Sequence, residues 1–176
     1  MVMYRRNIIP GARYFFTITL VDRASTLLIE RIAELRGAFR AARAQRPFTV
    51  DAIVVLPEHL HCIWTLPEGD ADYALRWREI KSWFSRRIPR DKLRSKGRIN
   101  KAERGIWQRR YWEHTLRDDR DVELHIDYIH YNPVKHGHVS RVADWPFSSF
   151  HRFVRRGIYS SDWGGDDVCV GGDFGE

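Results

Sequence analysis

The chain has 176 residues, of which 43% are hydrophobic, and carries a formal net charge of +7 with an isoelectric point near 9.7. This size and composition predict one globular domain and exclude a largely disordered chain, and the positive charge favours a polyanionic partner. No apolar run approaches the roughly 18 residues of a membrane helix, and residues 1–6 do not resemble a signal peptide. Cys62 and Cys169 form neither a disulfide framework nor a CxxC zinc site. We therefore expect a cytoplasmic protein with reduced thiols.

The charge is unevenly distributed along the sequence. Residues 76–110 contain 14 Lys or Arg and 3 acids, a net charge of +11, whereas residues 162–176 contain five acids and no base, a net charge of −5. This contrast predicts a basic domain over residues 1–160 and an acidic, glycine-rich tail over residues 161–176.

Hydrophobic periodicity predicts the elements of the first half of the chain. Residues 13–21 are aromatic or β-branched on both faces, which is typical of a buried strand. Apolar residues from Leu28 to Ala42 then recur at helical spacing, and this helix ends before Pro47. Residues 48–56 and 59–66 predict two strands whose short connection makes them antiparallel.

The second half of the chain also alternates between predicted helices and strands. A helical stripe runs from Tyr73 to Phe84 and ends at Pro89, and residues 90–105 form a basic loop without periodicity. A short strand is expected over residues 111–115, followed by a helix over residues 118–131 that is closed by Asn132-Pro133 and Gly137. A docked turn or short helix is expected near residues 145–150. The order β-α-β-β-α-β-α predicts an α+β fold, an antiparallel sheet with helices packed on it.

Two histidines define the first candidate site. His59 and His61 are two residues apart, so on a strand both imidazoles project from the same face and can reach one cation. Two imidazoles leave positions open for water or a phosphate oxygen. The spacing also fits two ordinary histidines at the start of a strand.

A polar stripe on the predicted helix 118–131 defines the second candidate site. His125, Tyr128 and Asn132 are spaced by three and four residues, so they share one helix face. The carbonyl oxygen of Asn132 is a candidate third ligand for a hard divalent ion, and the phenol of Tyr128 is a candidate nucleophile beside it. The alternative is that Tyr128 is packed and Asn132 caps the helix.

The sequence resembles the REP-associated tyrosine transposases, bacterial single-tyrosine members of the HUH nucleases. The resemblance extends from about Tyr4 to Trp163 and rests on five motifs in one order: residues 57–64 (PEHLHCIW), 76–81 (RWREIK), 107–114 (WQRRYWEH), 127–137 (DYIHYNPVKHG) and 144–150 (DWPFSSF). The loop at residues 90–105 is longer than the family pattern.

The resemblance implies an HUH-type (ferredoxin-like) fold and a role for each candidate residue. His59 and His61 would be the His-hydrophobic-His metal pair, Asn132 the helix-borne ligand of Mg²⁺ or Mn²⁺, and Tyr128 the nucleophile. Related insertion-sequence transposases carry Gln at the position of Asn132. The family cuts single-stranded DNA beside repetitive extragenic palindromes, through a 5′-phosphotyrosine. Palindromic hairpins are then the expected partners, with no membrane and no obligate protein partner implied.

The basic, Trp-rich middle of the chain is expected to bind DNA phosphates. Trp107, Tyr111 or Trp112 could stack on unpaired bases or be buried. His114 and His125 are candidate accessory residues near the site. The candidate DNA-binding residues are Arg5, Arg6, Arg76, Arg78, Lys81, Arg86, Arg87, Arg109, Arg110 and Lys135.

Two other functions compete with a transposase. A non-catalytic hairpin-binding protein would share the fold but could not form a covalent adduct with DNA. A rolling-circle initiator or relaxase usually has a helicase domain or a second nucleophilic tyrosine, and 176 residues leave no room for a helicase domain.

Overall fold

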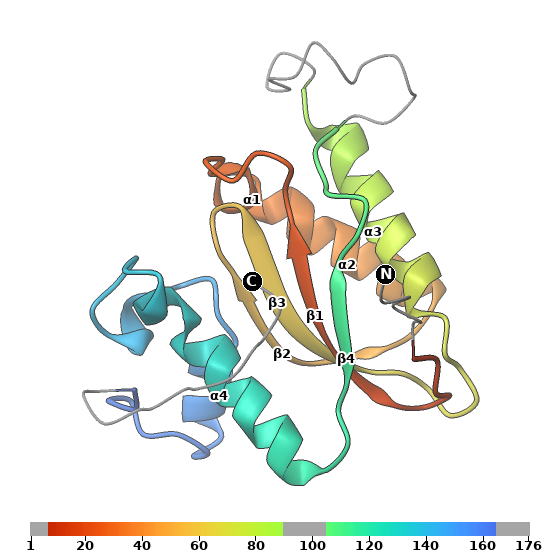
Figure 1. The fold of residues 1–176 in the computed structure, drawn as a ribbon. Helices are drawn as coiled ribbons and strands as arrows, with labels where there is room; N and C mark the ends of the chain where they lie inside the picture. The colour runs from red at the N-terminus through yellow and green to blue at the C-terminus, as the bar shows by residue number, and fades with distance from the viewer. Residues whose placement is uncertain (1–6, 90–104, 165–176) are drawn as a thin grey trace, which may run out of the picture.

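A computed structural model describes residues 7–89 and 105–164 (Figure 1). The α+β prediction is confirmed, with the strands and helices in the expected order. The elements are β1 (Arg13–Thr19), α1 (Leu27–Glu30), α2 (Ile32–Gln45), β2 (Thr49–Val55), β3 (His59–Thr65), α3 (Tyr73–Arg87), β4 (Trp112–Thr115), α4 (Asp119–Lys135), the 3₁₀ turn η3 (Val142–Asp144) and α5 (Phe150–Arg155).

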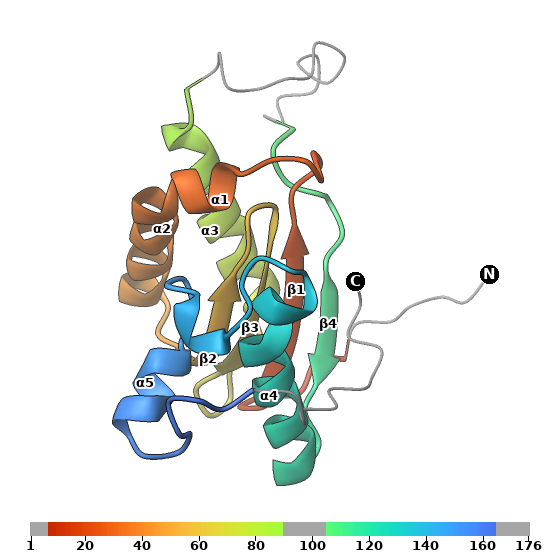
Figure 2. The same cartoon turned by 90° about the vertical axis from the view of Figure 1, so that its left-hand side faces the viewer.

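The four strands form one antiparallel sheet in the order β2-β3-β1-β4. Helices α2 and α3 cover one face, and α4 and α5 lie on the other (Figure 2). The alternation of strand side chains divides the core accordingly. Trp64 of β3 stacks on Trp77 of α3 with ring centroids 4.2 Å apart, whereas Ile63, one residue earlier, packs in the core that includes Ile129 of α4. Strand β3 therefore presents every second residue to α4.

The first predicted helix is divided in two. Arg31 leaves the helical conformation (φ −115°, ψ 35°), so α1 and α2 are separate where the sequence predicts one helix. The backbone N–H of Leu28 donates to Pro57 O at 3.1 Å, which fastens α1 to the turn between β2 and β3.

The predicted last residue of the last long helix, Tyr131, is wrong, whereas the predicted role of Gly137 in closing that helix is confirmed. Proline lacks an N–H and normally ends a helix, yet α4 continues through Pro133 to Lys135. The backbone N–H of His136 donates to Asn132 O at 3.0 Å, and Gly137 then ends the helix with a φ of +70°. The extra turn brings Lys135 and His136 to the site described below.

The N-terminal arm with Arg5 and Arg6, most of the basic 90–105 loop and residues 165–176 of the tail lie outside the described residues. Trp163 still packs on Tyr159, with ring centroids 4.5 Å apart, so the packed body reaches past residue 160. The division into a domain and a tail stays a prediction. Over residues 7–89 and 105–164, none of the helices combines the length and the apolar character that crossing a bilayer requires.

Candidate active site

The two histidines of β3 lie on the sheet face that α4 covers. His59 and His61 alternate with Leu60 and Cys62, which point into the opposite core. Both imidazoles are buried, and their ring centroids are 4.9 Å apart. The geometry therefore confirms the prediction that both histidines project from one face of the strand.

Each imidazole is oriented through its Nδ1 atom. Nδ1 of His61 is hydrogen-bonded to Thr17 Oγ1 at 2.9 Å, and Nδ1 of His59 to Glu58 Oε1 at 2.8 Å. Burial raises the pKa of Glu58, but its contacts with His59, a backbone hydrogen bond and the charge of Arg23 together outweigh this and leave the pKa lowered overall, so Glu58 remains a carboxylate. Partners of this kind fix the ring orientation of metal-binding histidines.

The Nε2 atom of His59 is buried and has no hydrogen-bond partner among the described residues. A buried polar atom without a partner costs roughly 1–3 kcal/mol. A cation at this point would remove that cost, so the residues present fit the divalent metal that the sequence analysis expects.

Helix α4 places its polar stripe against the histidines. The ring of Tyr128 lies 5.2 Å from that of His61, and the ring of His136 lies 5.3 Å from that of His59. Asn132 is fully buried and lies one turn from both Tyr128 and His136 on the same helix face. It therefore faces β3 between the two histidines, and the structure gathers all four predicted residues at one site.

Lys135 lies on Tyr128. Its Nζ donates to Tyr128 Oη at 3.4 Å and is 4.9 Å from the ring centroid. The sequence analysis assigned Lys135 to DNA phosphates and did not single out His136. Both were missed as neighbours of the site because the helix was expected to end at Pro133. The repeat of four residues through positions 128, 132 and 136 was the signal that could have found His136.

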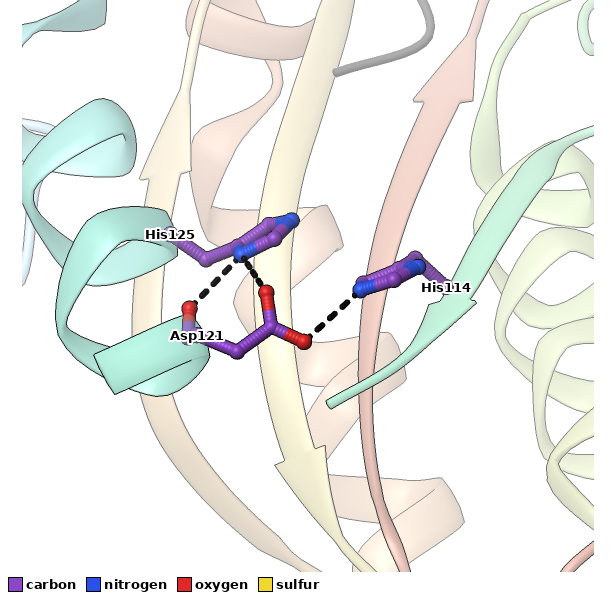
Figure 3. A group of neighbouring side chains, drawn as sticks. All are labelled: His114, Asp121 and His125. Carbon is purple, nitrogen blue, oxygen red and sulfur yellow. Dashed lines mark hydrogen bonds and ion pairs between the residues drawn. The ribbon is translucent and has the colours of Figure 1, made fainter. Parts of the chain in front are cut away.

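The accessory histidines form a second cluster around Asp121 (Figure 3). Asp121 Oδ2 accepts from His114 Nε2 at 3.0 Å, and His125 Nδ1 lies 2.7 Å from the backbone carbonyl of Asp121 and 3.1 Å from its Oδ1. The two imidazoles stack with centroids 4.9 Å apart. Phe15 lies between this cluster and the site, with its ring 4.8 Å from that of His125 and 5.6 Å from that of His61.

This cluster joins β4 to the first turns of α4. Burial lowers the pKa of His125, and its contacts with Asp121 only partly oppose that effect, so the ring is neutral near pH 7. One ligand atom from each of the three residues lies within 4.8 Å of the others, a spacing that could also hold a cation. Because a carbonyl only accepts, Nδ1 of His125 carries its proton toward Asp121 O, and the geometry is that of a hydrogen-bonded support for α4.

The comparisons with known proteins agree with this geometry. No protein-family model matches the chain. The chain is 49% identical to the REP-associated tyrosine transposase of Escherichia coli (strain K12) over 166 residues, which are 94% of this chain and 93% of that protein. It is 48% identical to a solved REP-associated tyrosine transposase bound to a REP hairpin, with a TM-score of 0.82 and 98% of each chain covered. The chain belongs to the REP-associated tyrosine transposases. The resemblance and the enzyme class predicted from the sequence are thereby confirmed.

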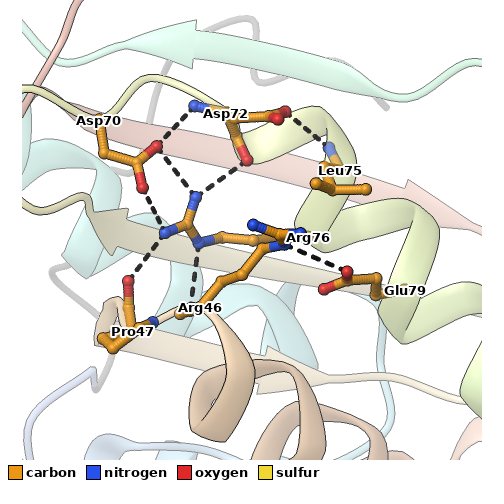
Figure 4. A network of polar contacts seen from close by, with 7 residues as sticks. All are labelled: Arg46, Pro47, Asp70, Asp72, Leu75, Arg76 and Glu79. Carbon is orange, nitrogen blue, oxygen red and sulfur yellow. Dashed lines mark hydrogen bonds and ion pairs between the residues drawn. The ribbon is translucent and has the colours of Figure 1, made fainter.

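One of the predicted DNA-binding arginines in this member of the family has a different task (Figure 4). Arg76 is only 1% exposed, and its guanidinium donates to Asp70 Oδ2 at 2.6 Å and to Pro47 O at 2.9 Å. Further bonds reach the carbonyls of Arg46 and Asp72. Arg76 fastens the start of α3 to the loop before β2, so the expectation that it is exposed to DNA is wrong.

The other predicted contacts are distributed over α3 and the segment before β4. Arg78, Arg86, Arg109 and Arg110 are exposed. Arg87 is also exposed, and its guanidinium lies 3.3 Å from the ring centroid of Trp83. Lys81 is half-buried, and its Nζ donates to Gln108 O at 3.1 Å. Since α3 and α4 lie on opposite faces of the sheet, the arginines of α3 are in the layer away from the His59–His61 pair.

Proposed function

We propose that the chain is a metal-dependent endonuclease and strand transferase that acts on single-stranded DNA at palindromic hairpins. The observation that carries the proposal is the position of Tyr128, which has Lys135 Nζ at 3.4 Å from its oxygen and His61 against its ring. A 48% identical relative is a REP-associated tyrosine transposase bound to a REP hairpin, which supports hairpin DNA as the substrate.

In this mechanism Tyr128 Oη attacks the phosphorus of a phosphodiester, and the bond from phosphorus to the 3′ oxygen breaks. The phosphate becomes attached to tyrosine as a 5′-phosphotyrosine, and the departing 3′ oxygen takes up a proton as a hydroxyl. The ammonium of Lys135 stabilises the negative charge that Tyr128 must carry to attack. No external energy source is needed, because attack by the 3′-hydroxyl of another strand reverses the step and releases Tyr128.

His59, His61 and Asn132 would hold the metal. Since Nδ1 of both histidines is hydrogen-bonded, the ligand atom of each ring would be Nε2. A bound Mg²⁺ or Mn²⁺ would supply Lewis-acid polarisation of the phosphate and would neutralise charge in the transition state. The amide oxygen of Asn132 suits such a hard ion better than it suits a structural zinc.

A labelled hairpin oligonucleotide and a denaturing gel test the proposal. The parent protein should form a covalent adduct with the DNA, and Tyr128→Phe should form none while still binding the hairpin, because the change removes only the proposed nucleophilic oxygen. Tyr131→Phe, on the same helix, is the matched control and should keep the adduct. An adduct in Tyr128→Phe would place the nucleophile elsewhere, and the absence of any adduct in the parent would leave a hairpin-binding protein.

A further inference from the structure

The exposed face of β4 holds an aromatic side chain beside the candidate active site. Three aromatic residues of the segment before and within β4 could stack on DNA bases, and the structure separates them. Trp107 and Tyr111 are partly buried against the core under α3, where Lys81 Nζ lies 5.9 Å and 5.0 Å from their ring centroids. Trp112 is 37% exposed, whereas tryptophan side chains are highly buried on average.

Strand register puts Trp112 in one line with the metal pair. Thr17 of β1 faces His61 of β3 on one side and Trp112 of β4 on the other. Residues directly opposite one another in antiparallel strands share a face, so all three side chains project toward the α4 side of the sheet. Two strand spacings of about 4.8 Å place the backbone of Trp112 roughly 10 Å from the backbone of His61.

The layer above the sheet leaves this position accessible. Helix α4 packs chiefly on β2 and β3 and meets the edge strand β4 through the cluster of His114, Asp121 and His125 (Figure 1). Trp112, two residues before His114 on the same face, remains 37% exposed. The chain on either side of β4 is basic and exposed, with Arg109 and Arg110 before it and Arg117 after it. An aromatic ring among cations, next to a site for a phosphodiester, has the chemistry of a platform for single-stranded DNA.

We propose that Trp112 stacks on an unpaired base next to the scissile phosphate and so positions the strand for attack by Tyr128. This inference rests on the proposed function. Because every base has a π face, the contact selects an unpaired nucleotide over a base pair and is tolerant of which base it is. It would hold the nucleotide where the strand leaves the hairpin, while the exposed arginines contact phosphates on either side.

The test uses the full chain carrying Tyr128→Phe, so that binding is measured without cleavage. The probe is a REP hairpin with a single-stranded extension, in which 2-aminopurine replaces each unpaired base next to the hairpin in turn. We expect quenching of the fluorescence at one position, and we expect Trp112→Leu to abolish that quenching and to weaken binding about 5- to 100-fold. Trp112→Phe keeps a ring and should keep part of both effects. Trp83→Leu, the same change at a tryptophan on the other face, should keep the quenching in full.

An abasic site in place of the quenched base separates stacking from an indirect effect. With that oligonucleotide the parent and Trp112→Leu should bind equally, because the base that Trp112 contacts is gone. A difference that persists on the abasic probe, or no position at which Trp112→Leu changes the quenching, would overturn the inference. So would a change in the oligomeric state of Trp112→Leu without DNA, since this would make the face a protein interface. If the chain with Tyr128 intact binds the probe and quenches its fluorescence but forms no adduct, the proposed cleavage is refuted and the stacking contact stays in place.

Discussion

Replacement of Arg76 by Met tests whether this arginine stabilises the fold or binds DNA. Met keeps much of the buried apolar stem and removes a guanidinium that donates five hydrogen bonds. The acceptors are both carboxylate oxygens of Asp70, at 3.1 and 2.6 Å, and the carbonyls of Arg46, Pro47 and Asp72, at 3.3, 2.9 and 3.0 Å. The change leaves these acceptors without their buried donor, although Arg46, Pro47 and Asp72 are exposed residues and Asp70 is partly exposed.

The expected loss of stability follows from this inventory. Removing one partner of a buried ion pair costs roughly 3–5 kcal/mol, because the remaining groups keep their desolvation penalty. Asp70 is partly exposed and can regain water, which favours the lower half of that range. We therefore expect Arg76→Met to lower the free energy of unfolding by about 3–4 kcal/mol. The hydrogen bond from Arg76 is the main cause of the lowered pKa of Asp70, so that pKa should also rise in the variant.

Urea unfolding of both Arg76→Met and Arg78→Met measures this difference. Arg78 is on the same helix but exposed, so its replacement should change the free energy of unfolding by no more than about 0.5 kcal/mol. It should instead weaken hairpin binding and reduce the slope of log affinity against log salt by about 1. Equal stability of the two variants would refute the structural role assigned to Arg76.

Three further predictions concern the helix that carries Tyr128 and the metal pair. Burial, with smaller contributions from Arg152 and His151, lowers the pKa of His130 to about 3. Because the unfolded chain binds this proton more readily, the contribution of neutral His130 to the free energy of unfolding is complete above about pH 6.5 and falls by about 2 kcal/mol on going to pH 5. His130→Gln should therefore weaken the dependence of the free energy of unfolding on pH between about pH 6.5 and pH 5. Cleavage should stop in EDTA and in His59→Ala while hairpin binding persists, and undiminished cleavage in EDTA would exclude the metal. Lys135→Gln should slow adduct formation about 10- to 100-fold with little change in hairpin affinity, and Lys135→Arg should recover part of the rate; equal rates would remove the role of the cation.

The central pairing of the site could be predicted from the sequence because it depends on local periodicity. A two-residue repeat on a strand places His59 and His61 on one face, and a four-residue repeat on a helix does the same for Tyr128 and Asn132. Which strand faces which helix does not follow from these repeats. The register of His61 with Thr17, and the resulting line to Trp112, needed the three-dimensional sheet.

The errors have tertiary causes. Arg76 looked like its exposed neighbours because its partners at positions 46 and 47 are about 30 residues away and provide backbone carbonyls, which leave no trace in the side-chain pattern. The rule that proline ends a helix failed at Pro133, which lies in the last turn of α4, close to the end that Gly137 provides. That rule hid the turn that places Lys135 on Tyr128.

The central claim is that Tyr128 becomes covalently attached to DNA, and peptide mass spectrometry of the adduct tests it most directly. The protein is incubated with a hairpin oligonucleotide and a divalent metal, and then digested with nuclease and protease. We predict that the peptide containing Tyr128 carries the added mass of a 5′-linked nucleotide and that its fragments place this mass on the tyrosine. A nucleotide on Tyr131 or on any other residue, or cleaved DNA with no modified peptide, would contradict the account.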